Sequence, residues 1–137
     1  MQTRTSLVHG TGVDEAYGLI HRGGLSSVLS VCVSRRSTIV SMTAFSQRLF
    51  GPVESAERSL TEADWDRLKT LVERACFWET PERHDRSGLD GFNWTIEGRN
   101  HDGYHSSECW SPDRGAFYEL GSLLVELSGL EIPQDTP

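Results

Sequence analysis

The sequence predicts an α+β fold, in which an antiparallel sheet of about four to five strands has two helices packed on one face. Two pairs of segments alternate apolar and polar residues around a turn, as β-hairpins do. Each pair is followed by a segment whose apolar residues recur at helical spacing, which gives the order ββαββα. No repeat or proline-rich linker divides the 137 residues. We therefore expect one domain over residues 1–137, with a flexible tail at 131–137.

The N-terminal part of the chain is poorly defined by its sequence. Five glycines in residues 1–24 interrupt every short apolar run. The sequence leaves open whether residues 17–20 form a strand and join the sheet.

The first predicted hairpin joins residues 26–33 to residues 38–45. Leu29, Val31 and Val33 repeat with a period of two, so their side chains share one face of a strand. The residues between the two segments are polar and suit a turn.

The first predicted helix begins after Thr61, whose hydroxyl can accept a hydrogen bond from a free amide of the first turn. Asp64, three residues later, gives a weak form of the capping box. We expect the helix to end near residues 77–78 and the indoles of Trp65 and Trp78 to be core anchors. The apolar positions at helical spacing are Trp65, Leu68, Leu71, Val72, Ala75 and Cys76.

A second hairpin is predicted to join residues 92–99 to residues 104–110. Ser111 is then a candidate N-cap before Pro112 at the first helical position. Gly129 is placed to end this last helix in a left-handed conformation. The apolar face of the helix consists of Phe117, Leu120, Leu123, Leu124 and Leu127.

The register of the second hairpin decides which of its residues are exposed. A three-residue loop at residues 101–103 places Trp94 opposite Trp110, and we expect both indoles to face the helices. The other face of the hairpin is then solvated, and a one-residue shift would exchange the two faces. On this exposed face we predict a weak binding surface made of Glu97, Arg99, His105, Ser107 and Cys109.

The same polar residues admit an alternative, a hydrolase. His105 beside Ser107 or Cys109, with Glu97 to orient the imidazole, is the residue set of nucleophilic catalysis. A flat sheet face, however, lacks a concave pocket and an oxyanion hole. We therefore favour a solvated face over an enzyme and assign no catalytic residue.

A metal site is a second alternative that the sequence suggests. His101, His105 and Cys109 follow one another at helical spacing, which would suit zinc on a helix. Residues 100–103 form a strong turn, however, and on strands His101 and Cys109 would lie far apart. We expect no metal and no cofactor.

The charge and composition of the chain limit the classes of binding partner and the compartment that we expect. The net charge is −7 and Lys69 is the single lysine, so neither nucleic acid nor an anionic membrane surface is an expected partner. No apolar run reaches about 18 residues, and none follows the N-terminus as in a secretory signal. An odd number of widely spaced cysteines is typical of reduced thiols, which favours the cytoplasm. They are Cys32, Cys76 and Cys109.

The C-terminal half resembles a group of small bacterial proteins of unknown function. The resemblance covers about residues 59–130 and implies an α+β fold and a cytoplasmic setting, without an activity. The motifs that support it are Leu-Thr-x-x-Asp-Trp at the first helix, Phe77-Trp78, Leu89-Asp90-Gly91 with Trp94 and Glu97-Gly98, Tyr104-His105, and Trp110-Ser111-Pro112.

Taken together, the sequence favours a small non-catalytic module that binds another protein. An immunity-type or antitoxin-like role would fit, because small acidic domains can mask basic partners through complementary charge. A homodimer is also compatible with the sequence.

Overall fold

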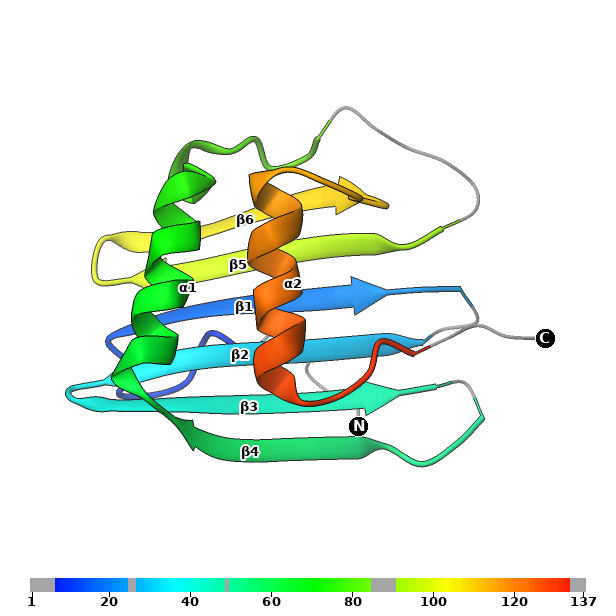
Figure 1. Ribbon diagram of the computed structural model, residues 1–137, viewed down its shortest axis with the longest axis horizontal. Helices are drawn as coiled ribbons and strands as arrows, with labels where there is room; N and C mark the ends of the chain where they lie inside the picture. The colour runs from blue at the N-terminus through cyan, green and yellow to red at the C-terminus, as the bar shows by residue number, and fades with distance from the viewer. Residues whose placement is uncertain (1–6, 25–26, 49, 85–90, 134–137) are drawn as a thin grey trace.

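A computed structural model describes residues 7–24, 27–48, 50–84 and 91–133. Six strands form one antiparallel sheet in the order β4-β3-β2-β1-β5-β6, and two helices run across one face of it (Figure 1). In chain order the elements are β1 (Glu15–Arg22), β2 (Val28–Arg36), β3 (Ile39–Gln47), β4 (Glu54–Leu60), α1 (Glu62–Arg74), the 3₁₀ turn η1 (Phe77–Glu79), β5 (Asn93–Asn100), β6 (Gly103–Trp110) and α2 (Ala116–Ser128).

The predicted α+β class and the placement of both helices on one face are confirmed, but the strand count and order differ. The sheet has six strands, and the order is ββββαββα. β1 resolves the open question about the N-terminal part, because it lies in the middle of the sheet between β2 and β5. β4 went unpredicted because most of its side chains are polar and exposed, and Ala56 and Leu60, its two partly buried apolar residues, are too far apart to show an alternation.

The main core lies between the sheet and the helices. The predicted alternation of Leu29, Val31 and Val33 is confirmed, since all three are buried in this core. Trp65 is also buried in this core, and the half-buried Trp78 packs against the core. The predicted apolar face of α2 contacts the same cluster, with Leu120, Leu123, Leu124 and Leu127 buried and Phe117 partly buried.

The predicted cap of α1 is confirmed, whereas its predicted end is not. The Thr61 hydroxyl accepts a bond from the Asp64 N–H (3.1 Å), and the Asp64 carboxylate accepts one from the Thr61 N–H (3.0 Å). The helix ends at Arg74, because Cys76 adopts a left-handed conformation with φ +48°. This change of direction places Phe77, the first residue of η1, in the core.

The second helix begins later than predicted. Ser111 does not cap it; its hydroxyl instead accepts a bond from the Phe92 N–H (3.0 Å) and closes the end of the β5–β6 hairpin. Gly115 is the N-cap, and Gly129, with φ +70°, ends the helix as predicted. Beyond the helix, Ile132 packs against the main core, and residues 134–137 of the predicted tail lie outside the described residues.

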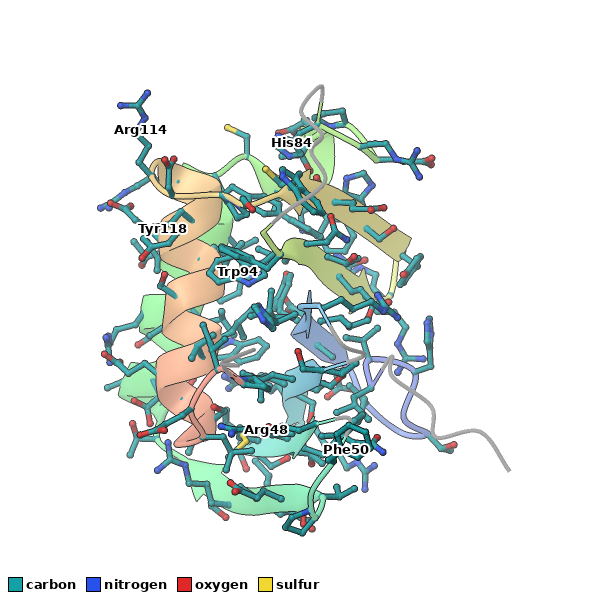
Figure 2. The ribbon with its side chains drawn as sticks, turned by 90° about the vertical axis from the view of Figure 1, so that its right-hand side faces the viewer. Arg48, Phe50, His84, Trp94, Arg114 and Tyr118 are labelled. Carbon is teal, nitrogen blue, oxygen red and sulfur yellow. The ribbon has the colours of Figure 1, made fainter. Side chains whose placement is uncertain are left out.

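The N-terminal segment covers part of the sheet face opposite the helices. Figure 2 shows this segment, in blue, on the far side of the sheet from α2. Val8 packs against Ala16 and Cys32 in a small second cluster. Within the described part of the chain, no helix is long and apolar enough to cross a membrane.

Candidate functional site

The turn of the β5–β6 hairpin is one residue shorter than predicted. Asn100 pairs with Gly103, which leaves only His101 and Asp102 in the loop. The Asn100 side-chain oxygen accepts bonds from the Asp102 N–H (2.9 Å) and the Gly103 N–H (3.1 Å). This side-chain bond closes the turn locally, as asparagine often does. The three-residue loop predicted from the sequence is therefore wrong.

The shift of one residue turns β6 over. Trp94 lies opposite Cys109 rather than Trp110, and only Trp94 faces the helices. The predicted exposed surface is consequently split between the two faces of the sheet. His105, Ser107 and Cys109 face the helices, whereas Glu97 and Arg99 lie on the opposite face with Tyr104 and Trp110.

A short segment after η1 covers part of the outer edge of β6. The His84 N–H donates to the Glu108 carbonyl and the Glu108 N–H donates to the Glu82 carbonyl, both at 2.9 Å. This segment places the His84 imidazole over Ser107, with Nε2 3.0 Å from the Ser107 hydroxyl. The hydroxyl is fully buried and also bonds the Pro81 carbonyl at 2.7 Å.

The directions of the hydrogen bonds between Ser107, His84 and Pro81 are the reverse of those that a nucleophilic serine needs. Ser107 has one hydroxyl proton, and it donates that proton to Pro81. The imidazole of His84 must therefore donate to Ser107, whereas a nucleophilic serine needs a histidine that accepts its proton. Burial lowers the pKa of His84, which favours the neutral ring.

His105 is held in the same way. Thr80 donates its hydroxyl proton to the Phe77 carbonyl (2.6 Å), so Nε2 of His105 donates to the Thr80 oxygen (3.1 Å). Glu97 cannot orient this ring, because the carboxylate lies on the other face of the sheet. The residue set of the predicted hydrolase is thus not brought together.

An aromatic group surrounds His105. The Phe77 ring packs edge-on against the imidazole with centroids 5.2 Å apart, and Trp78 lies 6.4 Å from it. Gly98, directly opposite His105 on β5, makes room for this packing, since a Cβ there would lie 2.6 Å from Phe77.

Trp94 has a partner that the sequence did not suggest. Its indole N–H donates to Nδ1 of the buried His21 at 2.9 Å, and Tyr118 stacks on the indole with centroids 5.7 Å apart. Figure 2 shows Trp94 between α2 and the sheet. His21 lies in the glycine-rich N-terminal part, where no periodicity marked it as a core residue.

On the opposite face, Glu97 is also buried and bound. The Tyr104 hydroxyl donates to its carboxylate at 2.5 Å, and Glu97 as a residue is only 3% exposed. Burial, together with the Glu97 carboxylate, raises the pKa of Tyr104 to about 12. Arg99 donates to the Gly10 carbonyl (2.7 Å), and the His9 ring packs on Tyr104. The N-terminal segment thus covers the other half of the predicted surface.

One stretch of the β6 edge stays open among the described residues. Alternate residues of a strand direct their backbone groups to the same side. Because Glu108 bonds outward to the segment at residues 82–84, Tyr104 and Ser106 also direct their N–H and C=O groups outward. No described backbone group from outside the hairpin bonds to these two residues.

A hollow of about 420 Å³ lies beside this open stretch, and no pattern of residues predicted it. Asp102, one of its lining residues, carries an exposed carboxylate. Glu79 and Glu82, also exposed, follow Trp78 in the sequence. The hollow is lined by Trp78, Asn100, Asp102, Gly103, Tyr104 and His105.

Metal ligands do not gather in this region. Of the residues that the structure describes, no three His, Cys, Asp or Glu side chains are placed to hold a metal ion. His101 lies in the turn, and Cys109 lies near the far end of β6, paired with Trp94.

No protein-family model matches the chain, and no curated protein matches it at a significant level.

Proposed function

We propose that this protein is a non-catalytic module that binds an extended, basic segment of another protein along the open edge of β6. The observation that supports it is the pair of outward-directed residues, Tyr104 and Ser106, next to the hollow beside Trp78. An immunity-type or antitoxin-like role is the more specific form of this proposal.

The backbone of β6 supplies the first part of the argument. An extended peptide can add a strand to an exposed sheet edge, and its main-chain hydrogen bonds then provide affinity. The chain itself uses the neighbouring part of this edge, where the segment at residues 82–84 bonds Glu108 on both sides. A partner segment would extend the same row of bonds to Ser106 and Tyr104.

The side chains around the hollow supply the specificity. Trp78 is half-buried, and the face of an indole attracts a guanidinium or ammonium group. Asp102, which lines the hollow, offers a carboxylate, and the exposed Glu79 directly follows Trp78 in the chain. Arg83, further along the chain, pairs instead with the Glu108 carboxylate at 3.8 Å. An arginine or lysine in the partner segment therefore fits best.

The proposal is tested with two blocked peptides, Thr-Arg-Val-Arg-Thr and Thr-Glu-Val-Glu-Thr, titrated into the labelled protein and followed by NMR. The arginine peptide should shift the amide signals of Gly103, Tyr104 and Ser106, and the glutamate peptide should not. Trp78→Ala should weaken the arginine peptide roughly tenfold, because a cation over a tryptophan contributes on the order of 1–2 kcal/mol.

Two variants control for the backbone and for folding. Ser106→Pro removes an N–H that points away from β5, so it should abolish peptide binding and keep the hairpin bonds. Ser122→Ala, on the half-buried side of α2, should bind like the wild type. Equal shifts with both peptides, or shifts that do not involve residues 103–106, would contradict the proposal.

A further inference from the structure

We propose that a second copy of this chain pairs with β4, so that two sheets join into one continuous sheet across a two-fold axis. β4 is the last strand at the sheet edge opposite β6 (Figure 1). No strand of the described residues pairs with its outer side. This surface is distinct from the peptide-binding edge proposed above.

The pairing of β2 with β3 determines which backbone groups of β4 are free. Arg36 and Ile39 flank a two-residue turn, so they form a hydrogen-bonded pair. Counting along β3, Met42 and Ala44 then direct their backbone groups to β4, where Arg58 and Ala56 face them. In β4 the remaining alternate residues direct their N–H and C=O groups outward, and these are Ser55, Glu57 and Ser59.

Charge favours the register of two antiparallel copies of β4 that places a glutamate of one copy opposite an arginine of the other. A two-fold axis perpendicular to the sheet keeps each face on its own side, so a residue of β4 must lie at its centre. An axis at Glu57 places two glutamates opposite each other, and an axis at Arg58 does the same with two arginines. Like charges directly opposite destabilise a strand pair.

An axis at Ala56 avoids both conflicts. Glu54 of each copy then lies opposite Arg58 of the other, which gives two pairs of opposite charge on the helix side of the sheet. Ser55 lies opposite Glu57, and both have outward backbone groups, so the two strands can exchange hydrogen bonds. Charges on an edge strand usually prevent pairing. Here their spacing of four residues makes the strand self-complementary.

Exposed apolar side chains lie at the same edge. Phe50 and Val53, in the loop before β4, are 88% and 57% exposed. Figure 2 shows Phe50 at the end of the sheet that carries this loop. With the axis at Ala56, Val53, the residue before β4, faces Ser59 of the second copy, and Phe50 belongs to the same loop. Pairing would therefore reduce the exposure of Val53.

The test is sedimentation equilibrium of the full chain over a range of concentrations at low salt. The wild type should dimerise, and Glu54→Arg should weaken the dimer about tenfold or more, because it places two like-charged pairs at the interface. Arg58 also donates a hydrogen bond to the Leu127 carbonyl of its own chain, so the double variant Glu54→Arg with Arg58→Glu is compared with Arg58→Glu alone, and it should dimerise more tightly than either single variant. Circular dichroism and thermal unfolding of each variant show whether it is folded.

Glu57→Gln is the matched control. This residue lies opposite Ser55 in the proposed register, so the change should leave the dimer unaffected. A stronger dimer with Glu57→Gln would point to an axis at Glu57 and overturn the register. A wild type that is monomeric at every concentration, or a double variant that dimerises no more tightly than either single variant, would overturn the proposal itself.

Discussion

Replacement of Ser107 by alanine should destabilise the fold strongly. The hydroxyl is fully buried, donates to the Pro81 carbonyl and accepts from His84. Its removal leaves both partners without this bond, and a buried unsatisfied group costs about 1–3 kcal/mol. His84 is partly exposed and can find water, so we expect a total loss of about 2–3 kcal/mol. A domain of this length should then melt roughly 10 °C lower.

The measurement is urea unfolding followed by tryptophan fluorescence, with Ser106→Ala as the matched control. Ser106 is the next residue along β6, but its side chain lies on the opposite, half-buried face. We expect the control to change the free energy of unfolding by less than about 0.5 kcal/mol.

The comparison separates a structural serine from a catalytic one. If Ser107→Ala were as stable as Ser106→Ala, the bonds to the segment at residues 80–84 would not hold the β6 edge, and the structural assignment of Ser107 and His84 would be refuted.

Three further predictions concern the cap and the titratable groups. Thr61→Ala should lower the free energy of unfolding by about 1 kcal/mol in the same urea assay, and an unchanged midpoint would argue against the cap. The folded pKa of Tyr104, about 12, lies above its ordinary value of 10.0, so its contribution to stability is complete below pH 10 and is lost as the pH rises through 12. Alkaline unfolding should therefore show this loss, and Glu97→Gln should lower the pKa in a spectrophotometric titration. With a thiol reagent, the exposed Cys76 should react quickly and the other two cysteines slowly. For Cys32, burial raises the pKa to about 12, and fast reaction of a second thiol would contradict this.

The helices were predictable because their signals are local. The capping box at Thr61 and Asp64 involves residues three positions apart, and the apolar spacing repeats with each turn. Leu29, Val31 and Val33 were predictable for the same reason, since alternation within one strand identifies its buried face.

The strand at the sheet edge could not be found in this way. β4 has no fully buried side chain, so its sequence shows no regular alternation of apolar and polar residues. The bond of Arg99 to the N-terminal segment and the covering of Ser107 by the segment at residues 80–84 depend on contacts between distant parts of the chain. Neither leaves a local signal in the sequence.

The register of β6 shows how a reasonable pattern can mislead. The positions of Trp94 and Trp110 favoured a register in which the two tryptophans lie opposite each other. The Asn100 side chain instead closes a turn that is one residue shorter. One residue of difference then exchanges the two faces of the strand. The candidate site consequently changes from an exposed polar face to a buried bonding group beside an open strand edge.

This register is the central claim, because it determines both the buried bonds of Ser107 and the outward groups of Ser106. Cross-strand contacts between Cα protons measure it directly by NMR, since these protons are close in the pairs that do not exchange hydrogen bonds. The structure predicts contacts from Glu97 to Ser106 and from Thr95 to Glu108. Contacts from Glu97 to Ser107 and from Thr95 to Cys109 would contradict it and return the polar residues of β6 to the outer face.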